Sequence, residues 1–375
     1  MDGAPWGGSE VLWSEAALRL HYEGHEISAS VAWRPQLPSK VARLAEKGVD
    51  VFTQPRPYPS RPERVWRRIR KRFGMGCAEI SWLRRTQADL AVISLGSIQD
   101  RLEWMRFCRD MQLPYAPILH CNSEIWWPTD ERRTEMALAY RSARKLFCVS
   151  RHNLELLQYQ IGESLPNAEV VWNPCNVPTD QPLAWPNQNG VWKLACVARL
   201  DAAAKGQDLM LKIVSQSKWR ERPLEINFYG TGPGEQSLKQ LANYLRLKNV
   251  HFRGHAMDVR QIWEENHLFV LPSRYEGLPL ALVEAMWCGR PAVVTNIGGN
   301  AEMCVDRETG FVAAAPTLGL FEQALECAWD CRDNWENMGK LARARTERLI
   351  PKDPVGQFCK KLLECTEKNK AENKT

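Results

Sequence analysis

Residues 271–302 read LPSRYEGLPLALVEAMWCGRPAVVTNIGGNAE, and this stretch decides the fold. An apolar run at 268–271 predicts a strand, a turn follows, and a helix is expected to start near Leu278, where Pro279 suits a first helical position. Apolar residues then recur at the helical period until Gly289, and the run at 291–295 predicts a second strand. This order of elements is typical of a parallel α/β sheet.

Two glutamates in this stretch are candidates for ligand binding. Glu276 and Glu284 have seven residues between them, which places them roughly 10 Å apart along a helix. That is too far for the pair of a double-displacement glycosidase, which needs about 5 Å. The turn lies at the carboxyl edge of the sheet, and the helix N-terminus at Gly277 and Leu278 offers free N–H groups to an anion. We therefore interpret the carboxylates as hydroxyl-binding groups on either side of a phosphate site.

The whole stretch, ending in Gly298-Gly299-Asn300-Ala301-Glu302, resembles the signature of the retaining family-four glycosyltransferases, also called glycosyl transferases group 1. The resemblance implies the GT-B fold, in which two Rossmann-like α/β domains face each other across a cleft. It also implies that Glu276 binds hydroxyls of a donor sugar and that Glu284 binds the ribose diol of its nucleotide. The alternative is an ordinary Rossmann strand–helix–strand unit with incidental acids.

Composition sets the broad class of the protein. The 375 residues are enough for two domains, and 44% hydrophobic with 25% charged residues is ordinary for a soluble globular protein. No apolar run reaches about 18 residues, and the first residues lack a signal-peptide pattern, so we expect a cytoplasmic protein. The 12 cysteines lack metal-site spacing and no Asp-x-Asp occurs, so we expect reduced thiols, no metal and no cofactor other than the donor.

Seven basic residues stand against one acid between Arg61 and Phe73. If this segment is helical, its apolar side chains form one stripe, as in a basic helix that lies on an anionic membrane. A surface helix that docks the stripe on its own domain is equally compatible. Nucleic acid is disfavoured, because no nucleic-acid fold motif accompanies the basic run.

Further ligand-binding positions follow from the resemblance. Gly7 and Gly8 match a loop whose backbone approaches donor phosphate and acceptor, although a flexible tail is the alternative. No apolar strand precedes this loop, so either the sheet of the first domain lacks its first strand or the sequence starts late. His120 matches a histidine that faces the donor sugar, and a purely structural histidine is the alternative. Gly254 matches a loop that holds the nucleotide base through its backbone.

Arg199 and Lys205 follow a predicted strand at 192–197 and resemble the family's pair that grips the donor diphosphate. Diphosphate needs full positive charge with hydrogen-bond donors, which Arg supplies as a planar fork and Lys as a point charge. An exposed Arg and Lys engaged in ion pairs is the alternative. Ser150 follows a predicted strand at 145–149. The segment 170–176 resembles the family's strand end before the linker, which would place Asn173 near the cleft. Helix capping or turn formation explains both residues equally well.

The alternation of elements predicts an N-terminal acceptor domain at 1–177, a Pro- and Asn-rich linker at 178–191, a nucleotide-sugar domain at 192–350, and a C-terminal helix at 351–375 that returns toward the first domain. The other predicted strands cover residues 27–33, 49–54, 90–95, 116–120, 145–149, 170–176, 224–228 and 250–254.

The resemblance implies a retaining, metal-independent transfer of sugar from a nucleoside-diphosphate donor to a hydroxyl of a glycan or lipid-linked acceptor. Such acceptors occur in the synthesis of cell-surface polysaccharides and glycolipids. Members of the family often act on lipid-linked acceptors at the inner membrane face. Two alternatives remain: a nucleotide-sugar epimerase of the same architecture, and a non-catalytic membrane-associated binding protein.

Overall fold

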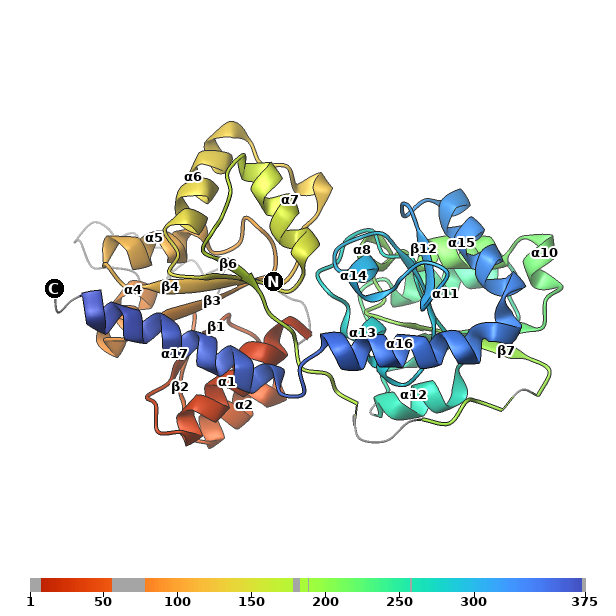
Figure 1. Cartoon of the computed structure of the whole chain (residues 1–375), viewed down its shortest axis with the longest axis horizontal. Helices are drawn as coiled ribbons and strands as arrows, with labels where there is room; N and C mark the ends of the chain where they lie inside the picture. The colour runs from red at the N-terminus through yellow and green to blue at the C-terminus, as the bar shows by residue number, and fades with distance from the viewer. Residues whose placement is uncertain (1–7, 56–77, 178–182, 188, 257, 373–375) are drawn as a thin grey trace.

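The computed structural model describes residues 8–55, 78–177, 183–187, 189–256 and 258–372. Figure 1 shows two lobes side by side, with the first half of the chain in one and most of the second half in the other. Both are α/β units whose sheets are parallel throughout. The predicted fold class is therefore confirmed. The basic segment between Arg61 and Phe73 lies outside the described residues.

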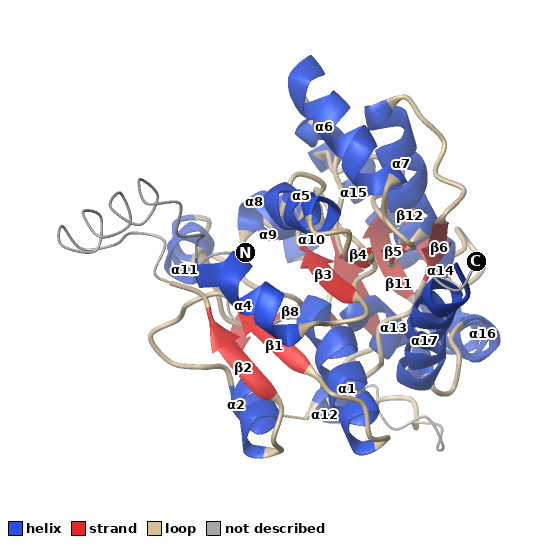
Figure 2. Ribbon diagram, turned by 90° about the vertical axis from the view of Figure 1, so that its left-hand side faces the viewer, coloured by secondary structure: helices blue, strands red, loops and turns tan. Residues whose placement is uncertain are grey.

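The first half contains, in order, α1 (Gly8–Tyr22), β1 (Ser28–Val31), α2 (Ser39–Glu46), β2 (Asp50–Thr53), α4 (Ala78–Thr86), β3 (Ala91–Leu95), α5 (Leu102–Asp110), β4 (Tyr115–Leu119), the short 3-10 helix η1 (Glu124–Trp126), α6 (Asp130–Arg141), β5 (Leu146–Cys148), α7 (Arg151–Ile161) and β6 (Ala168–Val170). The strands form a β1-β2 pair and a separate sheet in the order β3-β4-β5-β6, which Figure 2 shows in succession. In the described part of the chain, no strand precedes α1.

The second half contains β7 (Trp192–Val197), α8 (Ala202–Lys205), α9 (Gln207–Val214), α10 (Ser217–Arg220), β8 (Leu224–Tyr229), α11 (Glu235–Tyr244), β9 (Val250–Gly254), α12 (Val259–Glu265), β10 (Leu268–Leu271), α13 (Leu280–Trp287), β11 (Ala292–Thr295), α14 (Asn300–Met303), β12 (Gly310–Ala313), α15 (Leu318–Asp330), η2 (Arg332–Asn334), α16 (Trp335–Leu349) and α17 (Pro354–Glu372). Its six strands lie in the order β12-β11-β10-β7-β8-β9.

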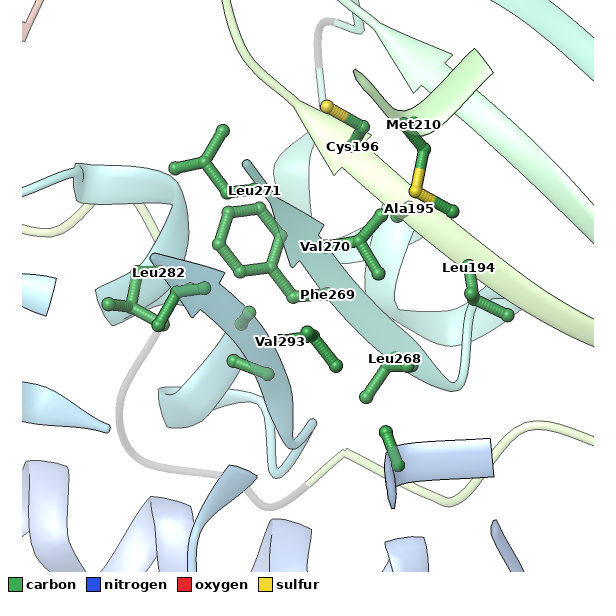
Figure 3. Packing of buried hydrophobic residues seen from close by; sticks show 14 of the residues in the cluster. Leu194, Ala195, Cys196, Met210, Leu268, Phe269, Val270, Leu271, Leu282 and Val293 are labelled. Atoms are coloured by element: carbon green, nitrogen blue, oxygen red, sulfur yellow. The ribbon is translucent and has the colours of Figure 1, made fainter. Parts of the chain in front are cut away.

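This strand order places a topological switch point between β7 and β10. The chain builds outward from β7 through β8 to β9, and then returns to β10 and builds outward on the other side. Apolar residues of the two central strands pack against helix residues such as Met210 and Leu282 (Figure 3). In open parallel sheets the loops that diverge at such a point leave a crevice for a ligand. The fold thus directs the loops after β7 and β10 to one place.

Most predicted strands match within one or two residues at each end, and two differences affect the region of the linker and the candidate site. The strand predicted at 170–176 is wrong: β6 ends at Val170, and the chain leaves the sheet there. Because β6 is an edge strand and Pro174 has no N–H to donate, continued pairing beyond it has little support. The helix expected near Leu278 begins at Leu280, with Pro279 as its N-cap.

The end of the chain packs against its beginning. Helix α16 lies on the second lobe, whereas α17 runs along the first, beside α1 (Figure 1). Their contact is apolar and includes Leu12, Ala16 and Leu20 on one side and Phe358, Cys359 and Leu362 on the other. We propose the division of the chain given above, with 178–191 as linker and α17 as a return to the first unit.

A buried arginine ties the linker to the second sheet. Arg290 is 1% exposed, and its Nη2 donates to the carbonyl oxygen of Ala184 at 2.6 Å. Its other nitrogens donate to carbonyl oxygens between residues 263 and 289 at 2.8–3.3 Å. The guanidinium also lies 5.2 Å from the ring centre of Trp185. Burial lowers the pKa of Arg290 to about 10, so it remains charged at neutral pH.

Replacing this side chain should destabilise the second lobe. We expect Arg290→Ala to lower its free energy of unfolding by about 2–4 kcal/mol, because several buried carbonyl groups lose their donors. Urea unfolding measures this difference. Arg260→Ala, which removes only a surface pair with Glu264, is the control and should cost less than about 0.5 kcal/mol. Equal urea midpoints for Arg290→Ala and Arg260→Ala would contradict the stabilising role of the Arg290 hydrogen bonds.

Candidate active site

The loops after β7 and β10 meet in an ion pair at the switch point. Lys205 Nζ lies 2.6 Å from Glu276 Oε1, and Ser273 Oγ donates to the same oxygen at 2.7 Å. Glu276 is only 5% exposed. Ser273 is held in turn by its carbonyl group, which accepts from Thr295 Oγ1 at 2.7 Å. Lys205 and Glu276, two predicted site residues 71 positions apart, therefore meet in a buried ion pair.

A glycine allows this close approach of the two loops. Gly206 has a φ of +66°, and a Cβ atom there would lie 1.9 Å from the carbonyl oxygen of Pro272. Any other residue would therefore push the loop after β7 away from the loop after β10. Lys205 is the last residue of the short helix α8, rather than part of the loop expected from the sequence.

Arg199 lies on the same loop, next to an acid. Arg199 Nη2 donates to Asp201 Oδ2 at 2.7 Å. The carbonyl oxygen of Arg199 accepts from Gln207 Nε2 at 2.8 Å. Tyr275, directly before Glu276, is close enough to Asp201 and Arg199 for their charges to act on its pKa, which burial raises. Both predicted phosphate-binding cations are thus engaged in ion pairs within the site.

The first lobe supplies the opposite wall. Asn122, just after β4, forms an antiparallel backbone bridge with Glu276. A Cβ atom on Gly277 would lie 1.8 Å from the carbonyl oxygen of His120, so the two backbones are in direct contact. Nearby, the ring of Trp126 lies 5.2 Å from that of Tyr275. The predicted residues His120, Glu276 and Gly277 are therefore brought together.

His120 is a buried residue, 7% exposed, and neither of its ring nitrogens has a hydrogen-bond partner among the described residues. Burial lowers the pKa of His120 to about 4. At neutral pH it is therefore an uncharged imidazole that can both donate and accept a hydrogen bond. A buried polar group without a partner is costly unless a ligand or water satisfies it.

The second predicted carboxylate occupies a separate position. Glu284 lies within α13, and its Oε1 accepts from Asn176 Nδ2 at 2.9 Å and more distantly from the Asn176 backbone N–H. Burial raises the pKa of Glu284, and the hydrogen bonds from Asn176 oppose that shift. Within the part of the chain that the structure describes, no Lys, Arg or His forms an ion pair with this carboxylate, which suits it to neutral hydroxyl donors.

Residues 192–330, which carry Lys205, Glu276 and Glu284, match the family model described as Glycosyl transferases group 1. The second half of the chain is therefore similar to this family.

Several curated relatives carry glycosyltransferase names. An uncharacterized glycosyltransferase of Haemophilus influenzae is 37% identical over 147 residues, covering 38% of this chain and 41% of the relative. The D-rhamnosyltransferase WbpZ of Pseudomonas aeruginosa is 32% identical over 126 residues, covering 32% of this chain and 33% of the relative. The chain thus spans well under half the length of these relatives.

Similarity of fold extends over almost the whole chain. Alr3699/HepE of Anabaena, solved in complex with UDP, has a TM-score of 0.72 at 16% identity, and covers 97% of this chain and 98% of its own. The lipopolysaccharide outer core galactosyltransferase WaaB in its apo form has a TM-score of 0.68 at 14% identity, and covers 96% of both chains. These similarities show that the two lobes together have the GT-B fold.

The remaining positions assigned by the family resemblance are scattered. Gly8 begins α1, while Gly7 lies outside the described residues. Gly254 ends β9 with a φ of +72°, and its carbonyl oxygen accepts from Gly230 N at 2.7 Å. Leu278 is buried just before the N-cap of α13. In the described ranges, no group of three His, Cys, Asp or Glu residues could hold a metal ion.

Several site residues were not predicted from the sequence. Ser273 lies in the family stretch three residues before Glu276, so its position was a usable signal. Asn122 and Asn176 come from the first half of the chain and carry no local pattern that pairs them with the two glutamates. Arg274 was also missed: it forms a two-pronged pair with Asp208 at 2.7 and 3.0 Å. This pair fixes the backbone directly before Tyr275.

The buried histidines make stability depend on pH. Burial lowers the pKa of His120 and of His267 to about 4. As pH falls below about 6.5, the unfolded chain binds protons that the folded chain refuses, so stability should fall until pH reaches about 4. Between pH 7 and pH 5, each histidine should lower the free energy of unfolding by about 2 kcal/mol.

Urea unfolding at pH 7 and pH 5 measures this loss. The double variant His120→Asn/His267→Asn should lose less stability over that interval than the wild type. His25→Asn, at an exposed position, is the matched control. A double variant with the wild-type pH dependence would show that other groups dominate.

Proposed function

We propose that this chain is a retaining glycosyltransferase that moves a sugar from a nucleoside-diphosphate donor to an acceptor hydroxyl. The Lys205–Glu276 pair carries the proposal, because it places a cation and a carboxylate at the switch point beside the start of α13. A diphosphate needs the cation and free backbone N–H groups, while a sugar needs a hydroxyl acceptor. The uncharged His120 on the facing wall adds a second group for sugar hydroxyls.

Each residue has a role in this scheme. Arg199 and Lys205, together with the backbone N–H groups of Gly277 and Leu278, would bind the diphosphate and neutralise its charge as it leaves. Arrival of the diphosphate would draw Lys205 from Glu276, which frees the carboxylate to accept from donor-sugar hydroxyls. Neutralisation by arginine, lysine and backbone groups requires no metal.

The nucleoside would lie farther from the reacting bond. Glu284 would exchange its hydrogen bonds from Asn176 for bonds from the ribose diol, and backbone groups around Gly254 would hold the base. Gly7 and Gly8 would approach the donor phosphate and the acceptor.

In the transfer step the bond between the anomeric carbon and the phosphate oxygen breaks, and a bond from the acceptor oxygen to that carbon forms. Retention of configuration follows if the acceptor attacks from the face of the leaving group, and the departing phosphate then takes the acceptor proton. The direct contact between Gly277 and the His120 backbone favours exclusion of water, which would otherwise hydrolyse the donor.

The acceptor we propose is a glycan or a lipid-linked saccharide. WbpZ and WaaB are named as enzymes that transfer rhamnose and galactose, the latter to the lipopolysaccharide outer core. Among the described residues, no helix has the length and apolarity to span a bilayer. We propose a cytoplasmic protein that reaches an inner membrane face through the basic segment between Arg61 and Phe73.

A thermal-shift panel with UDP, GDP and ADP tests the proposal. A nucleotide at one hundred times its dissociation constant adds about 2.7 kcal/mol of stability. UDP is the first candidate, because the similar Anabaena protein was solved with it. One base class should stabilise the wild type but not Arg199→Ala/Lys205→Ala. No stabilisation by any nucleotide would overturn the proposal.

Two controls sharpen the panel. Arg260→Ala/Lys340→Ala removes the same charge from surface pairs and should respond to nucleotide as the wild type does. Incubation with the matching nucleotide sugar and no acceptor separates transfer from epimerisation, since only an epimerase would convert the sugar.

A further inference from the structure

The first turn of α7 is capped by side chains from both halves of the chain. The first amides of a helix have no partner within it. Ser150 Oγ accepts from Asn153 N at 3.2 Å, which is an ordinary N-cap. The other two amides donate to Glu302 in the second half: Arg151 N at 3.1 Å to Oε2 and His152 N at 2.8 Å to Oε1.

Glu302 is itself held firmly by the second lobe. It lies in the one-turn helix α14, which Arg345 of α16 holds in place. Arg345 Nη2 donates to the carbonyl oxygen of Glu302 at 2.7 Å, and Arg345 Nε donates to the carbonyl oxygen of Met303 at 2.8 Å. Gly299, at the start of the same turn, packs so closely that a Cβ atom there would lie 3.0 Å from Ser150 Cβ. The carboxylate is therefore presented to α7 from a fixed support.

The contact with α7 lies beside the candidate site. Helix α7 follows β5, and β5 pairs with β4, the strand that ends just before His120. Val149 directly follows β5, and its Cγ2 would lie 2.9 Å from a Cβ atom on Gly277. A carboxylate at a helix N-terminus combines charge-assisted hydrogen bonds with a favourable helix dipole. A fixed contact between α7 and α14 therefore also holds the first-lobe segment at His120 against the loop that carries Glu276.

We propose that Glu302 is a positioning residue that clasps α7 and holds the two lobes in the arrangement where the backbone of His120 contacts Gly277. The inference rests on the proposed function for its catalytic meaning, but the clasp itself is a physical contact that can be measured without substrate. Removal of the carboxylate should release the first turn of α7 and let the lobes separate, while the nucleotide site on the second lobe stays intact.

Amide exchange of His152 measures the clasp directly. Histidine-selective ¹⁵N labelling reduces the spectrum to 7 residues, of which His152 is one. In Glu302→Ala, exchange at His152 should be about tenfold faster, because two charge-assisted bonds are lost. Glu308→Ala, an exposed acid on the turn after α14, is the matched control and should leave it unchanged. Glu302→Gln keeps one acceptor oxygen, so His152 should exchange at an intermediate rate in this variant. It replaces Glu302→Ala in the experiment if the alanine variant does not fold.

Solution scattering and UDP binding separate a clasp between lobes from a local helix cap. Glu302→Ala should increase the radius of gyration, whereas Ser150→Ala, which removes only the cap from the same lobe, should not. Faster exchange at His152 with unchanged scattering would overturn the proposal. UDP should raise the melting temperature of Glu302→Ala as much as that of the wild type. If UDP stabilised neither protein, the proposed function would be contradicted, but the exchange and scattering results on Glu302 would still hold.

Discussion

Glu276→Ala should lower the rate of sugar transfer by about 10²–10³-fold, the usual cost of removing one fixed polar group from a reacting centre. The carboxylate lies between Lys205 and Ser273 at 2.6 and 2.7 Å, so its position is fixed before any ligand arrives. Its loss would leave donor-sugar hydroxyls without their acceptor. Steady-state kinetics with the donor identified by the nucleotide panel measures the effect.

Nucleotide binding provides the control for this variant. Without Glu276, Lys205 keeps its full charge for the diphosphate, so the thermal shift caused by the matching nucleoside diphosphate should be preserved or increased. Glu276→Gln retains an oxygen acceptor but no charge, and should fall between the wild type and the alanine variant in rate. Unchanged turnover in Glu276→Ala would show that another group serves the sugar.

Gly277→Ala should cost about 10²-fold or more in transfer, as expected when reacting groups are displaced by about 1 Å. The new methyl group would lie 1.8 Å from the His120 carbonyl oxygen and 2.9 Å from Val149 Cγ2. Neither neighbour can yield without moving a strand end, so the first lobe must shift away from the second. Transfer kinetics and the radius of gyration both report this displacement.

Gly319→Ala is the matched control for that substitution. A Cβ atom at Gly319 meets nothing within 4 Å, so an alanine there adds the same methyl group without a collision. It should leave activity and scattering as in the wild type. Gly277→Ala with activity within about twofold of the wild type, less than 0.5 kcal/mol, would mean that the lobes need not touch at this point.

The second half of the fold could be predicted from the sequence because its signals are local. The stretch 271–302 correctly predicts β10, a helix and β11, since strand runs, helical periodicity and Gly or Pro boundaries all act within a few residues. The predicted strand at 192–197 matches β7 residue for residue. The first half was less regular: β6 was misplaced, because edge-strand pairing depends on neighbours rather than on local composition.

The sequence by itself therefore determined the α/β class, the order of elements and the residue types at the candidate site. Only the tertiary structure decided which of them meet: Lys205 with Glu276, Asn176 with Glu284, and Glu302 with the first turn of α7. The physical reason is that these contacts join segments 71 to 150 residues apart. Their geometry is set by the switch point between β7 and β10 and by the packing of the two lobes, and no local periodicity records either.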